Sequence, residues 1–313
     1  MPFNSILEYV EGPEGLGWTL YPVQRFILKL YYGLELDSTQ RTIIVHDMFL
    51  EQVRYTLTEQ EYLRFLFENG RCSVSDTSTL PRRGMVLSAG RRVGKDLLAE
   101  FIATYTIVQL LQMMDPHPVF GVTPRQRLNV LCFSMNAARR DALTSGIYYH
   151  IEHCQYLQSA LVSNTLTNIT FETHAGRQAG GTQGNLGLRS YSNVARTRGF
   201  SSVQLVVNEL AHMANERDAY AAIMPTVTPS GRYAILSTPR VASGAFYNAF
   251  MYGMQNESQG APLALQIPTW EIQQNLGEGL LRRAYNENPT RFLVEFGAQW
   301  GSSSRVVTIN IQI

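Results

Sequence analysis

The stretch Met-Val-Leu-Ser-Ala-Gly-Arg-Arg-Val-Gly-Lys-Asp, residues 85–96, decides the fold. Residues 85–88 are an apolar run typical of a buried strand, 89–94 predict a tight loop, and a helical pattern begins at Lys95. In that order, backbone N–H groups surround a phosphate, the start of the helix adds positive potential, and the lysine reaches the terminal phosphates. The stretch predicts a phosphate-binding loop, and we assign to the bound nucleotide Gly90, Arg91, Arg92, Val93, Gly94, Lys95 and Asp96.

The loop departs from the G-x-x-x-x-G-K-[ST] pattern of phosphate-binding loops at two positions. Ala89 replaces the first glycine, and Asp96 replaces the serine or threonine. Lys95 nevertheless stands out, because it and Lys29 are the only lysines in the chain. An ordinary turn between a strand and a helix is the alternative interpretation of this stretch.

A second apolar run, residues 204–207, ends in Asn208 and Glu209. Ligands bind at the carboxyl ends of strands in open α/β sheets, so Asn208 is a candidate metal ligand and Glu209 a candidate for orienting an attacking water. An aspartate is usual at the position of Asn208. If Asp96 and Asn208 both face the metal, one carboxylate and one neutral oxygen donor still serve Mg²⁺, with their roles exchanged. A surface turn, or an ATPase with weak or lost activity, would explain the same residues.

A third apolar run, residues 233–237, leads into Ser237-Thr238-Pro239. Hydroxyl groups at the end of such a strand are placed to sense a terminal phosphate. We expect these three residues to couple the presence or absence of that phosphate to the rest of the protein. A plain strand-to-turn junction is the alternative, since serine, threonine and proline are ordinary turn residues.

Short apolar runs alternate with longer helical stretches through the chain. The runs are 84–88, 128–134, 203–207 and 233–237, and the longest helices are expected at 95–113 and 136–158. This alternation indicates an α/β fold with a central, mainly parallel sheet flanked by helices. Together with the phosphate loop, it predicts a P-loop NTPase of the RecA/ASCE type.

Turn and cap signals place the remaining elements. A helix is expected from Pro22 to Gly33, another after a capping box at Thr58, and a closing helix over 289–300. The glycine-rich segment 176–187 predicts a β-hairpin or a mobile loop, because no Lys-Ser/Thr follows its glycines.

Composition bounds the class of protein. With 313 residues, 45% hydrophobic and 16% charged, the chain is expected to form one principal globular domain. A net charge of +1 gives no whole-molecule attraction to DNA, so contact with nucleic acid would need a local arginine surface. Cys72, Cys132 and Cys154 form no CxxC pair, which argues against disulfides and structural zinc. No apolar run approaches the roughly 20 residues of a membrane span, so we expect a soluble, cytoplasmic protein.

Four motifs together resemble those of one family, the ATPase domain of the large terminase subunit of tailed bacteriophages. In chain order they are Gln24 in Leu-Tyr-Pro-Val-Gln, the arginine-bearing loop 90–95, Arg198-Gly199-Phe200 ahead of Val-Val-Asn208-Glu209, and Ser237-Thr238-Pro239. The resemblance covers about residues 15–300. It is specific because four separated motifs agree in order and approximate spacing.

The resemblance implies a motor that hydrolyses ATP, with Mg²⁺, to translocate double-stranded DNA into a preformed procapsid. Carried over position by position, Gln24 would contact the adenine, Lys95 the β and γ phosphates, and Glu209 would be the catalytic carboxylate. Arg91 would sense or stabilise the γ-phosphate. Arg198 would enter the site of a neighbouring subunit and offset transition-state charge.

The resemblance also implies partners, namely double-stranded DNA, the portal protein, the small terminase subunit and further copies in a pentameric ring on the procapsid. Isolated domains of this kind are expected to be monomeric, and no membrane is involved. The expected place of action is the host cytoplasm, docked at the portal. Two rivals stay open: a catalytically weak or silent nucleotide-binding ring subunit, and a helicase-type DNA-dependent ATPase, which needs a second RecA-like domain for which the chain has no room.

Three segments are expected along the chain. Residues 1–80 form an N-terminal helical part of the ATPase domain with the adenine-contacting motif, and 81–300 form the P-loop ATPase core. Residues 301–313 are a linker, or the start of a C-terminal nuclease domain that the family carries and this chain is too short to hold. We expect no nuclease activity, because 306–313 contain neither aspartate nor glutamate.

Overall fold

The computed structural model resolves two compact units, each made of two stretches of chain. The residues it describes are 3–45, 55–178, 180, 184–194, 199–256, 258, 260–273 and 278–301. The first unit comprises Met1–Thr19 and Asp96–Ala234, and the second comprises Leu20–Lys95 and Ile235–Ile313. The roles assigned above to the continuous segments 1–80, 81–300 and 301–313 stay a prediction, and residues 302–313 lie outside the described ones.

The strands of the first unit follow the order β9-β8-β4-β7-β6-β5. Their bounds are β4 Leu128–Ser134, β5 Leu161–Thr165, β6 Asn168–Phe171, β7 Leu186–Tyr191, β8 Ser202–Asn208 and β9 Val227–Ser237, whose last residues belong to the second unit. β4 runs parallel to β7 and to β8, whereas β6 runs antiparallel to β5 and β7. The strands predicted at 128–134 and 203–207 are therefore confirmed, and the glycine-rich segment joins an antiparallel pair.

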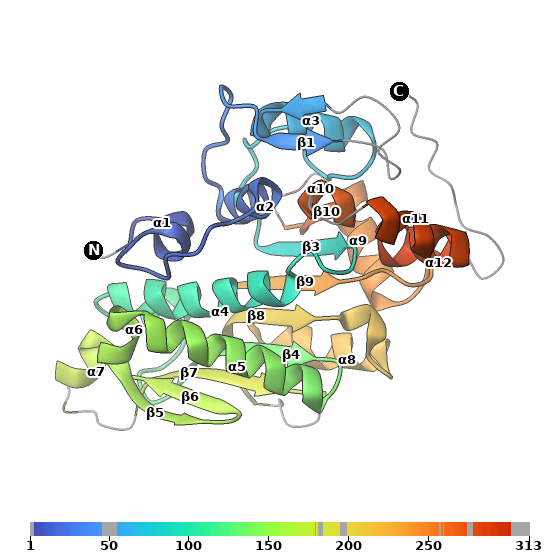
Figure 1. Ribbon diagram of the computed structural model, residues 1–313. Coiled ribbons are helices and arrows are strands. Elements are labelled where there is room, and N and C mark those ends of the chain that lie inside the picture. Colours follow the sequence, from blue (N-terminus) through green and yellow to red (C-terminus); the bar gives the residue numbers. More distant parts are fainter. Residues whose placement is uncertain are drawn as a thin grey trace. The chain divides into compact units, whose positions relative to one another are not determined.

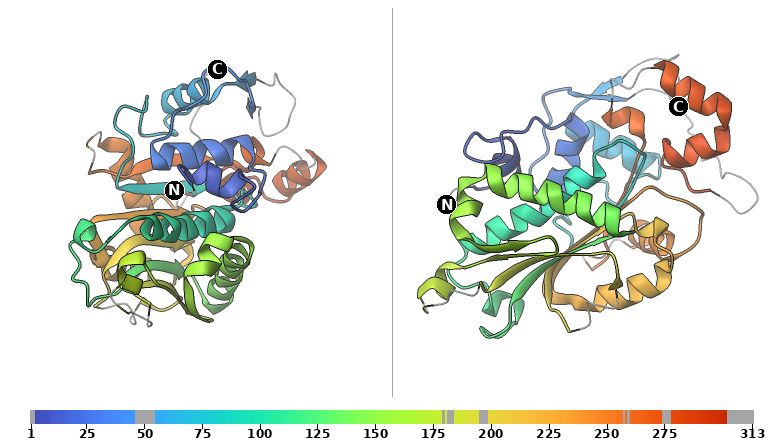
Figure 2. Two further views of the ribbon diagram at one scale, coloured as in Figure 1. Left: turned by 90° about the vertical axis from the view of Figure 1, so that its left-hand side faces the viewer. Right: turned by 60° about the horizontal axis from the view of Figure 1, so that its bottom comes forward.

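Helices cover both faces of this sheet. They are α1 Ile6–Glu11, α4 Lys95–Gln112, α5 Ala137–His153, α6 Gln155–Ala160, α7 His174–Gln178 and α8 Glu216–Ile223, with short 3-10 turns η1 Pro118–Phe120, η3 Leu210–His212 and η4 Met224–Thr226. Within the first unit α4 and α5 lie side by side over one face of the strands, and α8 lies over the other (Figures 1 and 2). The helix expected over 136–158 is interrupted, because Cys154 adopts an extended conformation between α5 and α6.

The second unit contains a smaller group of strands in the order β10-β3-β9. β3 Gly84–Ala89 is fully buried and runs parallel to β10 Leu263–Ile267, which the sequence analysis did not predict. A separate hairpin pairs β1 Ile43–Val45 with β2 Tyr55–Leu57. Both units thus contain mainly parallel strands with helices packed on them, which confirms the predicted α/β fold.

The described helices of the second unit include three that the sequence predicts, beginning at Pro22, Glu59 and Pro289, and three that it does not. They are α2 Pro22–Tyr32, α3 Glu59–Glu68, α9 Ala245–Gln255, α10 Thr269–Ile272, α11 Glu278–Glu287 and α12 Pro289–Glu295. Gly33 ends α2 with a φ of 69°, and the predicted capping box at Thr58 is present. The closing helix is shorter than expected, because the chain leaves the helix at Phe296 and reaches a φ of 54° at Ala298.

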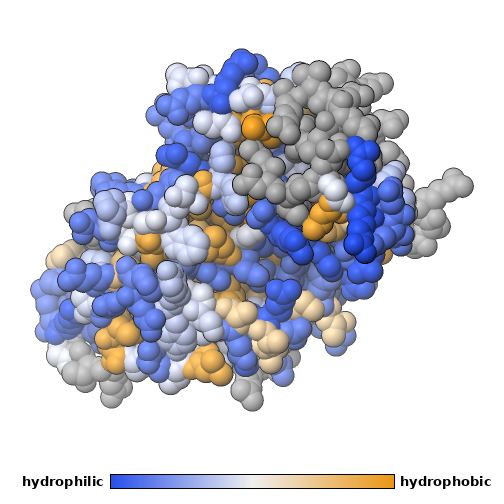
Figure 3. Space-filling view, viewed as in Figure 1, coloured by the Kyte–Doolittle hydropathy of each residue, from blue (hydrophilic) through white to orange (hydrophobic). Residues whose placement is uncertain are grey.

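On the face drawn in Figure 3, hydrophobic side chains are scattered among hydrophilic ones. None of the described helices is both long and apolar enough to cross a bilayer. Cys72, Cys132 and Cys154 are all buried and free.

Gly146 in α5 generates a stability prediction. A Cβ at this position would overlap the carboxyl group of Glu100, which is buried beneath it. Gly146→Ala should therefore lower the free energy of unfolding in a urea titration by about 1–3 kcal/mol. The control is Gly279→Ala in α11, where a Cβ meets nothing, so that alanine should stabilise the helix by roughly 0.5–1 kcal/mol. Equal effects of the two substitutions would contradict the packing argument.

Candidate functional site

The loop between β3 and α4 has the backbone of an anion-binding turn. Arg92 and Gly94 have φ values of 63° and 79°. Glycine adopts this left-handed conformation readily, whereas an arginine is strained in it. Left-handed residues inside a turn are a feature of backbone nests, which direct N–H groups toward anions. Gly90 is required for a different reason, because a Cβ there would overlap Thr269 and the carbonyl of Phe296.

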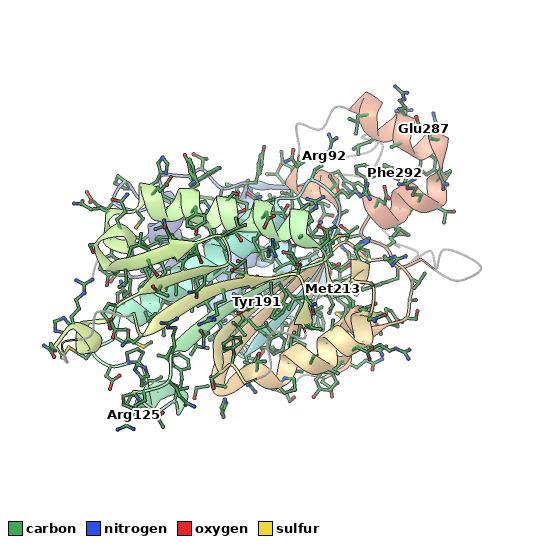
Figure 4. The ribbon with its side chains drawn as sticks, turned by 90° about the horizontal axis from the view of Figure 1, so that it is seen from below. Arg92, Arg125, Tyr191, Met213, Glu287 and Phe292 are labelled. Atoms are coloured by element: carbon green, nitrogen blue, oxygen red, sulfur yellow. The ribbon has the colours of Figure 1, made fainter. Side chains whose placement is uncertain are left out.

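Hydrogen bonds anchor this loop to the C-terminal part of the second unit. The N–H of Gly90 donates to the carbonyl of Ile267 at 3.1 Å, and that of Arg91 donates to the carbonyl of Glu295 at 2.7 Å. The hydroxyl of Thr269 donates to the carbonyl of Arg91 at 2.8 Å. Arg92 accordingly lies beside this helical part of the chain (Figure 4). These hydrogen bonds were not predicted, because no local sequence pattern indicates contacts between residues so far apart in the chain.

Lys95 lies buried beneath the loop, with 6% of its surface exposed. Its Nζ donates to the carbonyl oxygen of Gly90 at 2.8 Å and to Oγ1 of Thr238 at 2.9 Å. Both of these partners are neutral oxygen acceptors. The structure therefore brings the predicted phosphate-binding lysine to the predicted coupling motif, in which Ser237, Thr238 and Pro239 are all buried.

Gln24 lies near the start of α2 and contacts the same loop. Its Nε2 donates to the carbonyl of Val93 at 3.0 Å, and its Oε1 accepts from the N–H of Tyr21 at 3.2 Å. A glutamine amide carries two N–H donors and two lone pairs, so one of each is left by these two bonds. The position next to the loop agrees with a nucleotide contact, but recognition of adenine stays a prediction.

Of the two arginines assigned to catalysis, Arg91 and Arg198, the structure describes only Arg91. Arg91 is half exposed, and its guanidinium forms an ion pair with Glu295 at 3.2 Å. Arg291 shares the same carboxylate at 2.8 Å. Arg198 lies outside the described residues. Its proposed action on a neighbouring subunit stays a prediction.

In the first unit, the two residues assigned to a metal are in contact. Asp96 follows Lys95 in the first turn of α4, and Nδ2 of Asn208 donates to one of its carboxylate oxygens. Arg139 approaches the other oxygen at 3.5 Å, an exposed ion pair of small energetic value. Asn208 is 1% exposed, and among the described residues its Oδ1 has no hydrogen-bond partner. An orphaned buried oxygen beside a carboxylate fits a Mg²⁺ ion, which takes hard oxygen ligands.

The histidines of the stretch His150–Cys154 do not face a common metal position. His150 is buried and faces Glu100, whereas His153 is exposed and bonds to the carbonyl of Tyr149. Over the part of the chain that the structure describes, no three His, Cys, Asp or Glu side chains form a metal-binding group. An ion at Asp96 would therefore complete its coordination with phosphate oxygens and water.

Glu209 follows β8 in a conformation unusual for glutamate. Its φ of 62° and ψ of 47° are left-handed, and such strain in a non-glycine residue clusters at functional sites. The side chain is mostly buried, and its Oε2 lies 3.9 Å from Nε2 of His212. Within the first unit, the end of β8 thus presents Asn208 and Glu209 in succession, as the sequence predicts.

Glu100 lies one helical turn after Asp96 and is buried against α5. Its Oε2 is 3.0 Å from Nε2 of His150, and the rings of Trp18, Phe101 and Tyr149 surround that histidine. Burial raises the pKa of Glu100 above its ordinary value of 4.5, although the hydrogen bond with His150 opposes the shift. The negative charge of Asp96 raises this pKa further.

The raised pKa of Glu100 predicts a pH dependence of stability. Because the folded protein holds this proton more tightly than the unfolded chain, the contribution of Glu100 is present below pH 4.5 and is lost as pH rises through the folded pKa. Glu100→Gln should flatten the decline of unfolding free energy as pH rises above 4.5 in urea titrations. Glu152→Gln, which changes an exposed residue of α5, should leave the wild-type slope intact. A Glu100→Gln variant with the wild-type slope would argue against the assigned shift.

No protein-family model and no curated protein matches this sequence. Solved structures do match it. The ATPase domain of the large terminase of Thermus phage P74-26 is 16% identical, with a TM-score of 0.51 over 69% of this chain and 88% of that chain. The large terminase of bacteriophage HK97 is 10% identical, with a TM-score of 0.51 over 90% of this chain and 56% of that one.

At such low identities the likeness is one of fold. It agrees with the element order, the mainly parallel strands and the loop between β3 and α4 described above. The chain has the fold of the ATPase domains of bacteriophage large terminases, which is a P-loop NTPase fold of the ASCE type.

Proposed function

We propose that the chain is the ATP-hydrolysing motor domain of a viral large terminase, which drives double-stranded DNA into a procapsid. The observation that carries the proposal is the buried ammonium of Lys95, held by Gly90 and Thr238 at the start of a helix. A buried lysine after a strand and a nest-like loop is the arrangement that binds the terminal phosphates of a nucleotide. DNA translocation rests on the resemblance to terminases and on the shared fold.

In this proposal the loop residues from Gly90 to Asp96 bind the phosphates of ATP, and Gln24 contacts the base. Glu209 orients the attacking water, and Arg91 exchanges Glu295 for the γ-phosphate. Arg198 acts on the nucleotide of a neighbouring copy. Bound Mg²⁺ would neutralise charge that develops on the phosphates, held by Asp96 and Asn208. Thr238, bonded to the lysine, passes the state of the site into β9.

The proposed setting is that of a packaging motor. Further copies form a ring on the portal, the small terminase subunit delivers the DNA, and the reaction takes place in the host cytoplasm. The second candidate is a silent nucleotide-binding ring subunit. One observation favours it, namely that the amide of Asn208 already donates to Asp96 and so occupies part of the carboxylate.

Hydrolysis by the wild type and by Glu209→Gln separates the two candidates. We expect the wild type to hydrolyse ATP in the presence of Mg²⁺ and DNA. We expect Glu209→Gln to lower kcat by at least about 100-fold, because it removes the group that orients water, while ADP binding persists. Phosphate release measures the rate and calorimetry measures binding. The exposed Glu152→Gln variant serves as the control with wild-type kcat.

Absence of hydrolysis by the wild type, at concentrations where it assembles, would favour the silent subunit. Absence of ADP binding would overturn both candidates.

The exchanged metal ligands are tested by exchanging them back. Asp96→Ser alone should lower the Mg²⁺-dependent rate by about tenfold or more, since it removes the one carboxylate of the pair. Asn208→Asp alone places two carboxylates together and should also impair activity. The double variant restores the usual pattern and should recover most of the rate, which gives a coupling in a double-mutant cycle. Additive effects, or an unchanged Mg²⁺ dependence in Asp96→Ser, would remove the hypothesis.

A further inference from the structure

A buried hydroxyl lies beside Asn208, on the neighbouring strand, and has no role in the site proposed so far. It belongs to Ser134, the last residue of β4. β4 and β8 are parallel neighbours, and Ser134 pairs with Asn208 in their register. Side chains at paired positions of adjacent strands project from the same face of a sheet. Ser134 and Asn208 therefore stand side by side at the carboxyl end of the sheet, on the face that Asn208 turns toward Asp96.

Both side chains carry a buried oxygen without a partner. Ser134 is 2% exposed and Asn208 is 1% exposed. Among the described residues, neither Oγ of Ser134 nor Oδ1 of Asn208 has a hydrogen-bond partner. Buried polar atoms are normally paired, and an unpaired one is costly. Two neighbouring acceptor oxygens at the end of two strands point to a positively charged partner.

The chemistry of the phosphate loop identifies what that partner is. In the usual pattern, the serine or threonine after the lysine gives its hydroxyl to Mg²⁺, and here Asp96 stands at that position. We propose that the Ser134 hydroxyl completes the divalent-cation site of Asp96 and Asn208, in place of the hydroxyl that the loop lacks. The inference rests on the proposed function, because the nucleotide brings the cation. One carboxylate, one amide oxygen and one hydroxyl are all hard donors, which suit Mg²⁺ and Mn²⁺.

The chain offers a matched control in Ser190 of β7. Ser190 is 1% exposed, and within the described structure its Oγ also has no partner. It pairs with Cys132, two residues before the end of β4, and not with a residue at the strand ends. Ser190→Ala therefore makes the same chemical change as Ser134→Ala at the same burial. An orphaned hydroxyl alone does not distinguish the two positions, whereas the neighbourhood of Asn208 does.

The test measures metal binding directly on the full chain. Mn²⁺ affinity is followed by electron paramagnetic resonance with saturating ADP, and ADP affinity is measured by calorimetry in EDTA. Ser134→Ala should weaken Mn²⁺ by about tenfold and leave ADP affinity in EDTA unchanged. Ser190→Ala should change neither. Ser134→Cys replaces a hard oxygen with a soft sulfur, so Mg²⁺ should bind more weakly and Cd²⁺ more tightly.

The possible failures are distinguishable. Equal Mn²⁺ affinities in Ser134→Ala and Ser190→Ala, or a Ser134→Cys variant without the shift toward Cd²⁺, would overturn the assignment of Ser134. A wild type that binds no ADP with or without metal would instead overturn the proposed function. If Ser134→Ala melts well below Ser190→Ala, the metal preference of Ser134→Cys decides the question, because a loss of packing does not change which cation is preferred.

Discussion

The site depends on the burial of one ammonium group. Removing Lys95 from water is costly unless its N–H donors find partners, and Gly90 and Thr238 supply two of them. The loop that carries the Gly90 carbonyl packs closely on Thr269 and the backbone of Phe296, which excludes any side chain at position 90. The charge that would bind phosphate is therefore positioned by residues far from it in sequence, and the end of β9 is tied to the loop through the same group.

Features set by neighbouring residues were predictable from the sequence. Pro22 and Gly33 mark the ends of α2, Thr58 caps α3, and the continuous apolar run at 128–134 is a strand, because each depends on residues within one turn or one strand. β10 was missed because Leu-Ala-Leu-Gln-Ile is only a five-residue run, and it becomes a strand by pairing with β3. Tertiary context, rather than local preference, decides such segments.

The candidate site likewise has features that the sequence predicts and contacts that only the structure reveals. The sequence places Lys95 before Asp96 and Asn208 before Glu209, and the structure adds which atoms they contact. The sequence alone does not reveal that Arg91 pairs with Glu295, or that Thr269 holds the loop, because those contacts join distant parts of the chain. Ser134 is the clearest case. Nothing in the sequence separates it from Ser190, and only the strand register sets it beside Asn208.

The buried cysteines have a practical consequence. Cys72 belongs to the second unit, and Cys132 to the first. Burial raises the pKa of each thiol to about 12, so alkylating reagents meet neither a thiolate nor an open path while the protein is folded. The chain therefore carries native probes inside both units, Cys72 in the second and Cys132 and Cys154 in the first. Mass spectrometry of trapped cysteines would time the transient opening of each half separately, without any introduced label.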